Sequence, residues 1–275
     1  MHLKQKMPLV FAVASPSPSR PFWLLPNLLS LDAPIVAIVW QRLFAYCLQV
    51  TVPLPISLVL GFTVWLIYSA DRVLDARRGQ CSTARHHFHY LHAAALTRIW
   101  PAVLICTAML ALSTLPLRVF VCGAILLALV AIYFVLIHFG LTHGKLAWNL
   151  RKEPAVAIIF AAGVTLAPFA LALHLRMAVV CAAALFMALC WINCQGIETW
   201  NKPGTNLSLQ CAAVTAAALA LAFFEPALAT AIFLSAVALS VLDRVRTKFS
   251  AEAVRVLADA ALLSPLVFAA ITQRM

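Results

Sequence analysis

Two aspartates stand four residues apart where an apolar stretch gives way to a basic one. Asp71 and Asp75 are followed directly by Arg77 and Arg78, and Arg72 lies between them. On a helix this spacing places both carboxylates on one face, about one turn apart. Two like charges so close repel each other, so the pair needs a positive partner. The sequence offers two: a divalent cation, or the neighbouring arginines.

The first alternative is a metal site. Mg²⁺ prefers carboxylate oxygens and keeps waters and phosphate oxygens as its other ligands. Aspartates on one helix face can therefore hold the Mg²⁺ of a diphosphate whose lipid tail enters the bilayer. The second alternative is structural: the aspartates form salt bridges with the arginines near the membrane surface, where charge is costly. The spacing alone does not decide between them.

Further polar residues stand near the ends of other apolar stretches. Glu198 follows Asn193 at the end of one stretch, and it either ligates a metal or pairs with Lys202 four residues later. Lys145 and Lys152 lie between two stretches and bring positive charge to the same side. These residues are candidates for binding an anionic substrate.

Two features allow a functional and a simpler interpretation. Asp259 lies seven residues into the last apolar stretch, and an aspartate within a membrane is a functional candidate. Pairing with Arg255 one turn earlier is the simpler account. His86, His89 and His92 recur every third residue. They either cap the site or belong to an amphipathic segment at headgroup depth.

The amino-acid composition of the chain is typical of a protein that folds in lipid rather than in water. Of its 275 residues, 64% are hydrophobic and only 11% are charged, whereas a soluble domain has about 25% charged residues. Its apolar runs approach the ~20 residues that cross a membrane as a helix. They are rich in Ala and Leu and lack strict alternation, which favours helices over a barrel. We expect an all-α polytopic membrane protein.

Nine apolar stretches, separated by prolines and charged connections, predict nine transmembrane helices. They cover residues 28–50, 55–73, 99–115, 118–140, 154–173, 177–198, 207–224, 227–242 and 252–272. Residues 1–26 are expected to form a flexible basic tail ahead of a single transmembrane domain, residues 27–275.

The connections alternate in charge. Those after the second, fourth, sixth and eighth stretches are longer and basic, whereas the others are short, with only Arg118 and Arg176 as basic residues. The positive-inside rule therefore places the N-terminus and the long connections in the cytoplasm and the C-terminus outside. We expect an integral protein of the bacterial inner membrane.

The balance of charge and the cysteines exclude other classes. Lys and Arg outnumber Asp and Glu by 20 to 9. In a membrane protein this excess indicates loops that face anionic headgroups, with an anionic substrate as a further source, and not nucleic acid. The eight cysteines mostly lie inside apolar stretches, without metal-ligand spacing, so we expect neither disulfides nor a zinc site.

The layout resembles the UbiA superfamily of intramembrane prenyltransferases. Residues 31–35 (LDAPI) are similar to the start of the first helix in that family. Asp71 and Asp75 match the two carboxylates of its first aspartate-rich motif, at the end of the second helix. Lys152 and Glu153, followed by residues 157–163, are similar to the start of the fifth helix.

The resemblance implies nine helices around a cavity that opens to the cytoplasm. It also implies a Mg²⁺-dependent reaction of a prenyl diphosphate: transfer to an aromatic or lipid acceptor, or terpene cyclisation. It assigns Asp71 and Asp75 as catalytic residues; Asp71, Asp75 and Glu198 as metal ligands; and Arg72, Arg78, Lys145, Lys152, Asn193 and Glu198 as substrate-binding residues.

Three positions depart from the pattern of the family. Its asparagine four residues before the first aspartate is Ile67 here. Its two aspartates at the end of the sixth helix are reduced to one acid, Glu198. Its YxxxK motif is absent, because Ile137 stands four residues after Tyr133. An uncompensated charge near a low-dielectric region costs several kcal/mol, so these departures bear on activity more than on fold.

Two other functions fit the same sequence. One is a non-catalytic, lipid-binding relative that keeps the fold and half of the site. The other is a small transporter, for which the distinguishing features are paired broken helices and buried polar residues at mid-membrane.

Overall fold

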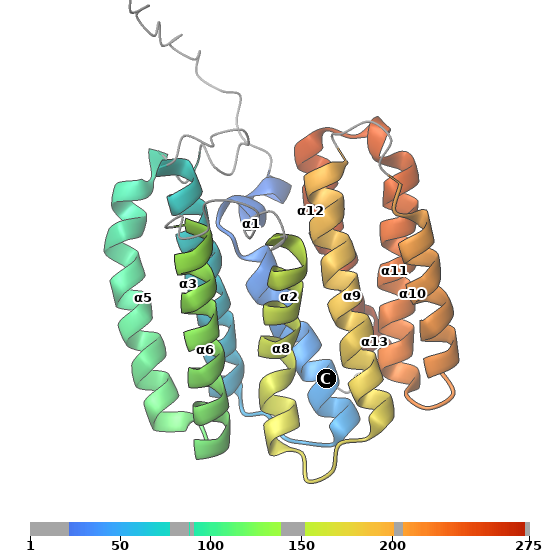
Figure 1. The fold of residues 1–275 in the computed structure, drawn as a ribbon, viewed down its shortest axis with the longest axis horizontal. Coiled ribbons are helices and arrows are strands. Elements are labelled where there is room, and N and C mark those ends of the chain that lie inside the picture. The colour runs from blue at the N-terminus through green and yellow to red at the C-terminus, as the bar shows by residue number, and fades with distance from the viewer. Residues whose placement is uncertain (1–21, 78–87, 89–90, 139–151, 201–205, 273–275) are drawn as a thin grey trace, which may run out of the picture.

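A computed structural model describes residues 22–77, 88, 91–138, 152–200 and 206–272. Every regular element in these ranges is a helix (Figure 1). Six helices are long and apolar enough to cross a membrane. They are α3 (Leu54–Arg77), α5 (Ala93–Thr114), α6 (Leu117–His138), α8 (Lys152–Leu171), α9 (Met177–Thr199) and α11 (Pro226–Val245).

Two further spans are bent pairs of helices. The short helices η1 (Phe22–Leu24) and α1 (Leu25–Leu28) meet α2 (Asp32–Leu48) at 81°. Near the other terminus, α12 (Ala251–Ala261) meets α13 (Ser264–Thr272) at 49°. Each pair is long and apolar enough to form one span, which raises the number of candidate spans in the described chain to eight.

The expected count of nine spans is not confirmed. The stretch predicted at 207–224 forms α10 (Ser208–Leu221), which has only 14 residues and is shorter than a typical membrane span. The stretches predicted at 28–50 and 252–272 are broken rather than straight. The all-helical class and the positions of the apolar stretches agree with the sequence. A short 3₁₀ turn, η2 (Arg246–Lys248), links α11 to α12.

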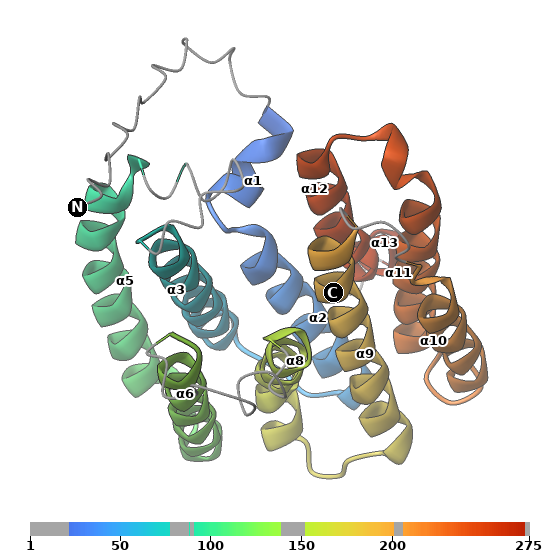
Figure 2. The same ribbon diagram turned by 45° about the horizontal axis from the view of Figure 1, so that its top comes forward.

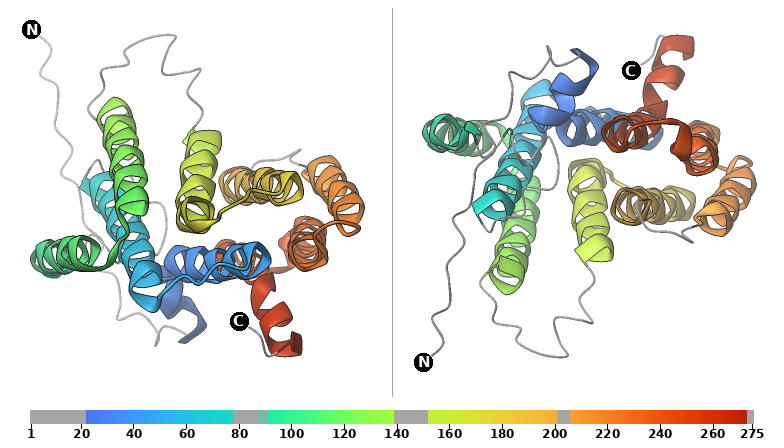
Figure 3. Two further views of the ribbon diagram at one scale, coloured as in Figure 1. Left: turned by 90° about the horizontal axis from the view of Figure 1, so that it is seen from below. Right: turned by 90° about the horizontal axis from the view of Figure 1, so that it is seen from above.

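The centre of the bundle is an aromatic core between α2 and α9. Trp40, Phe44 and Phe186 are fully buried, and the rings of Trp40 and Phe186 stack with centroids 4.3 Å apart. In Figure 3, α2 and α8 lie between α5 and α6 on one side and α10 and α11 on the other. Close packing of large rings in the middle fixes how α2 and α9 face each other.

The outermost helices show apolar side chains on most of their surface. Of the membrane-length apolar segment in each helix, only 6% is buried inside the protein in α5 and 11% in α6, whereas 50% is buried in α11. Exposed residues such as Ile105, Leu112 and Ile125 would be unfavourable in water. This is the pattern expected of helices that face lipid.

The two ends of the bundle differ (Figure 1). At one end α3, α6, α9 and α11 finish and α5, α8, α10 and α12 begin. We call this the basic end, because Arg98, Lys152, Arg244, Lys248 and Arg255 belong to the helix termini there. The opposite end carries the short turns between helices, and we call it the tight-turn end.

The bend between α12 and α13 follows from a proline. Pro265 has no N–H to donate, so the carbonyl of Ala261 lacks its usual helical partner. The Ser235 hydroxyl of α11 donates to that carbonyl at 2.8 Å, and the indole Nε1 of Trp40 donates to the carbonyl of Leu262 at 2.7 Å. The bend is thus stabilised by two neighbouring helices.

The bend between α1 and α2 occurs at Ser30. This residue is buried and has a φ of 54°, in the left-handed region. Asp32 then begins α2, and its Oδ1 accepts a hydrogen bond from the N–H of Ala33 at 3.0 Å. A carboxylate in the first turn is favourable there because of the helix dipole. The turn brings Asn27 of α1 back toward Asp32.

Candidate functional site

Asp71 lies between two cations at the basic end. The Nζ of Lys152, at the start of α8, is 3.3 Å from Oδ1 and 3.4 Å from Oδ2 of Asp71. The guanidinium of Arg72 is 3.9 Å from Oδ2. The side chains of Asp71 and Arg72 are each only 16% exposed, whereas that of Lys152 is 42% exposed. The positive partners of Asp71 are thus Arg72, one of the arginines that the sequence offered, and Lys152 from another helix, which the sequence did not offer as its partner.

Other predicted site residues lie partly or wholly outside the described part of the chain. Asp75 belongs to α3, one turn beyond Asp71, but its side chain is not described. Arg78 and Lys145 lie outside the described residues, as do His86 and His89. Their predicted roles stay predictions.

A second polar group joins four helices on the neighbouring side of the bundle. The Nδ2 of Asn27 donates to Asp32 at 2.7 Å and to Asp259 at 3.3 Å, both through Oδ2. The Nδ2 of Asn193 donates to Oδ1 of Asp259 at 3.2 Å. Both asparagines are more than nine-tenths buried. Asn193 therefore donates its amide N–H to a carboxylate, and its predicted role in substrate binding stays a prediction.

The two polar groups act on each other electrostatically. The charges of Asp259 and Arg72, together with those of Lys152 and Glu153, all act on the thiol of Cys194. These charges come from three helices, so α3, α8 and α12 present charged side chains to the region around Cys194 of α9. Arg72 of α3 and Asp259 of α12 thus both lie near Cys194.

Arg255 of α12 extends this region toward Glu198. Arg72, Glu198 and Asp259 each interact electrostatically with its guanidinium. Glu198 itself is exposed at the end of α9. We call these residues the polar cluster: Asn27, Asp32, Asp71, Arg72, Lys152, Asn193, Glu198, Arg255 and Asp259.

Parts of the polar cluster have unused hydrogen-bonding capacity. Within the described residues, the Nε of Arg72 and the Oδ1 of Asn193 are buried without a hydrogen-bond partner. The same holds for the Oε1 of Gln195. A buried polar atom without a partner costs about 1–3 kcal/mol, so a ligand that supplies partners would be stabilised there.

The donor chemistry near Asp71 is compatible with Mg²⁺. Mg²⁺ is commonly bound by one or two carboxylates together with substrate phosphates, and Asp71 and Asp75 are two carboxylates on one helix. Across the described residues, no three His, Cys, Asp or Glu side chains form a group that could hold a metal. Because Lys152 contacts both oxygens of Asp71, a cation there would have to displace it.

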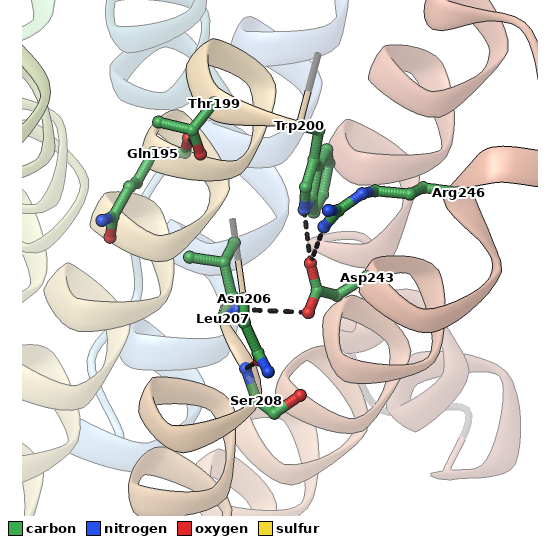
Figure 4. A network of polar contacts seen from close by, with 8 residues as sticks. All are labelled: Gln195, Thr199, Trp200, Asn206, Leu207, Ser208, Asp243 and Arg246. Carbon is green, nitrogen blue, oxygen red and sulfur yellow. Dashed lines mark hydrogen bonds and ion pairs between the residues drawn. The ribbon is translucent and has the colours of Figure 1, made fainter. Parts of the chain in front are cut away.

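A separate network holds the helix ends beside the polar cluster (Figure 4). Asp243 of α11 accepts from the indole Nε1 of Trp200 at 2.7 Å and from the N–H of Leu207 at 3.1 Å. It also forms an ion pair with Arg246. Asp243 thereby fixes the end of α9 and the start of α10 against the end of α11. The sequence alone assigned no partner to it.

A glycine explains how Trp200 reaches this network. A Cβ on Gly196 would lie 2.7 Å from the indole ring of Trp200, closer than non-bonded atoms approach. The indole can lie against α9 only because residue 196 has no side chain. Gly196 thus positions Trp200 for its hydrogen bond to Asp243.

Comparison of the chain with family models, with curated proteins and with solved structures finds no match. The site is therefore interpreted from its own residues. The residues that carry the resemblance lie at helix ends. Residues 31–35 begin α2, Asp71 lies in the last turns of α3, and Lys152 begins α8.

Proposed function

We propose that this protein is a UbiA-like membrane enzyme that acts on a prenyl diphosphate with Mg²⁺. Two observations carry the proposal: Arg72 and Lys152 lie beside Asp71, and Arg255 interacts electrostatically with Arg72 and Asp259. A diphosphate is a small, multiply charged anion, and guanidinium and ammonium groups are its usual partners in proteins. The apolar helices below supply an environment for an isoprenoid tail.

Each charged residue has a role in this proposal. Arg72 and Arg255 bind phosphate oxygens, and the unpartnered Nε of Arg72 gains an acceptor. Lys152 exchanges its contact with Asp71 for one with the diphosphate, which leaves Asp71, together with Asp75, for the metal. Mg²⁺, when bound, offsets charge on the departing diphosphate. The surrounding apolar side chains exclude water from the allylic carbon.

Asp259 compensates for the acids that the sixth span lacks. The UbiA pattern has two aspartates there, and this chain has Glu198 alone. Asp259 of α12 meets Asn193 of that span through a hydrogen bond of 3.2 Å. We infer that the carboxylate facing Asp71 across the site is Asp259. The acceptor is an aromatic ring, a second lipid or a double bond of the same chain.

The proposed setting is the inner membrane of a bacterium, with the N-terminus in the cytoplasm and the C-terminus outside. The gathering of basic residues at one end of the bundle supports it (Figure 1). In this orientation the polar cluster opens toward the cytoplasm, where soluble diphosphate substrates and Mg²⁺ are present.

A transporter is the second candidate, and the broken helices favour it. The two bent spans pack against each other, and Asn27 hydrogen-bonds to acids on both of them. Discontinuous helices with polar groups at the break are typical of transporter sites. Under this alternative the polar cluster would move an ion or an anion rather than promote chemistry.

Binding and turnover assays separate the candidates. Purified protein is incubated with geranyl, farnesyl and geranylgeranyl diphosphate, with and without Mg²⁺, and both thermal stability and pyrophosphate release are followed. We expect a Mg²⁺-dependent rise in stability and release of pyrophosphate with at least one of them. Inorganic diphosphate serves as the control for the headgroup alone.

The outcomes have distinct meanings. Stabilisation without pyrophosphate release, with aromatic and lipid acceptors present, would indicate the non-catalytic lipid-binding alternative. No response to any prenyl diphosphate would refute the enzyme proposal. Uptake of an ion or anion into proteoliposomes would then support the transporter.

A further inference from the structure

A cavity of about 880 Å³, widely open to the outside, lies at the tight-turn end, away from the polar cluster. It is bounded by the end of α2, the start of α11 and α13. In Figure 3, α13 projects from the side of the bundle, and its Phe268 lines the cavity together with Tyr46 of α2. Ligand-binding pockets in proteins have volumes of about 300–1,000 Å³, so this cavity has the size of a binding site.

The cavity carries an ion pair whose members come from two different turns. The Nη1 of Arg176, just before α9, lies 3.0 Å from Oε1 of Glu225, just before α11. The Nη2 of Arg176 is 3.3 Å from Oε2 and also donates to the carbonyl of Cys47. The contact is therefore a two-pronged one, which fixes both side chains.

The side chains of Glu225 and Arg176 differ in burial. The side chain of Glu225 is only 7% exposed, and burial raises the pKa of this carboxyl, while Arg176 acts to lower it. The side chain of Arg176 is 53% exposed. A guanidinium has five N–H donors, and Arg176 uses only part of them on Glu225 and Cys47. Both residues line the cavity, so each can meet a second partner there.

The walls include aromatic and aliphatic residues, with Gln49, Thr51 and Thr230 as polar neighbours. The rings of Tyr46 and Phe268 lie 5.7 Å apart by centroid, and Phe224, on the rim, is 72% exposed. Aromatic rings at the end of an apolar bundle are typical of headgroup depth in a membrane. The cavity thus combines a hydrocarbon-compatible wall with a positive and a negative group side by side.

We propose that this cavity binds a zwitterionic phospholipid of the phosphatidylethanolamine type. Its phosphate contacts Arg176, its ammonium contacts Glu225, and the start of its acyl chains lies against Tyr46 and Phe268. Opposite charges 3.0 Å apart match a headgroup that carries both signs. An anionic headgroup without an ammonium would place its charge beside Glu225 uncompensated, and a quaternary ammonium has no N–H to donate to the carboxylate.

This inference is independent of the proposed enzyme, because none of the residues involved belongs to the polar cluster. It is tested by titrating the full-length protein in detergent with phosphatidylethanolamine, phosphatidylcholine and phosphatidylglycerol of identical acyl chains. Bound lipid is counted by native mass spectrometry. We expect phosphatidylethanolamine to bind about tenfold more tightly than either of the others, the scale of one charge-assisted hydrogen bond.

Variants test whether the preference for phosphatidylethanolamine arises from the cavity. Glu225→Gln should abolish the discrimination between the ethanolamine and choline headgroups, and Arg176→Gln should weaken all three lipids. Arg118→Gln is the matched control, since Arg118 is an exposed arginine at the same end, outside the cavity. It should leave the preference unchanged.

A cavity-filling variant keeps the test decisive if an ion-pair variant fails to fold. Thr230 of α11 lines the cavity and is exposed, so Thr230→Trp fills the space without touching the ion pair. It should remove the tightly bound phosphatidylethanolamine. Equal binding of the three lipids by the wild type, a preference for phosphatidylglycerol, or unchanged binding in Thr230→Trp would each overturn the proposal.

Discussion

At the scale of single residues, the enzyme proposal requires Asp71 to exchange its contact with Lys152 for a metal. Asp71→Asn and Asp75→Asn keep the shape and remove one negative charge each. If the pair holds Mg²⁺ for a diphosphate, we expect turnover to fall by about a hundredfold or more. Mg²⁺-dependent stabilisation by geranylgeranyl diphosphate should be lost as well. Pyrophosphate release and thermal unfolding measure the two effects.

The unliganded stability of Asp71→Asn distinguishes the catalytic role from a structural one. The ion pair with Lys152 is partly exposed, and such pairs contribute about 1 kcal/mol or less. The variant should therefore unfold close to the wild type. Glu252→Gln removes an acid at the same end and serves as the control. A marked loss of stability with an unchanged Mg²⁺ response would show that the pair is a structural salt bridge.

We expect Asp259 to contribute more to stability than Asp71, because the asparagines that donate to it are buried. Its two carboxylate oxygens accept from Asn27 and Asn193, and its charge acts on Arg255. Asp259→Asn should destabilise the protein by about 1–3 kcal/mol, since amides would face amides and the half-buried Arg255 would lose its neighbour. Chemical unfolding in detergent measures this cost. Stability equal to wild type would mean that the carboxylate is not part of a buried network.

At the scale of the elements, the end of α9 is fixed by a glycine and a tryptophan. In Gly196→Ala the new methyl would lie 2.7 Å from the indole of Trp200. The ring must move, so its 2.7 Å hydrogen bond to Asp243 should weaken and stability should fall by about 1–3 kcal/mol. A double-mutant cycle with Trp200→Phe tests the cause. If the cost of Gly196→Ala stays the same in the Trp200→Phe background, the indole is not responsible.

The elements also show how far the sequence predicted this fold. The all-helical class and the positions of the apolar stretches followed from composition and spacing, because the lipid environment requires long apolar helices. The break at 262–263 has a local cause in the sequence, Pro265. No glycine or adjoining proline in the sequence predicts the bend at Ser30.

The candidate site was predictable only in part, because some of its contacts join residues that are far apart in the sequence. Asp71, Lys152, Asn193 and Glu198 were named from residue type and position at the ends of apolar stretches. The contact of Asn27 with Asp259 joins residues 232 positions apart, and no local pattern encodes such a pair. The sequence offered Arg255 as the partner of Asp259, and the structure adds two asparagines to it.

At the scale of the whole molecule, the arrangement of charge implies an orientation in the membrane. The described basic end carries Arg98, Lys152, Arg244, Lys248 and Arg255, whereas the tight-turn end carries Arg118, Arg176 and the guanidinium of Arg42, which donates to the carbonyl of Val52. Figure 2, with the top of the molecule turned forward, shows the starts of α5, α8 and α12 at that same end. Because positive residues are retained on the cytoplasmic side, the basic end should face the cytoplasm.

Cysteine labelling from either side of the membrane tests this orientation. In a cysteine-free background, Lys248→Cys marks the basic end and Leu173→Cys marks the tight-turn end; both positions are exposed. In intact cells, a membrane-impermeant maleimide should label residue 173 and not residue 248. In inverted vesicles the pattern should reverse. Labelling of residue 248 from outside would turn the polar cluster away from the cytoplasm and from its supply of diphosphates, so the enzyme proposal would fail together with the orientation.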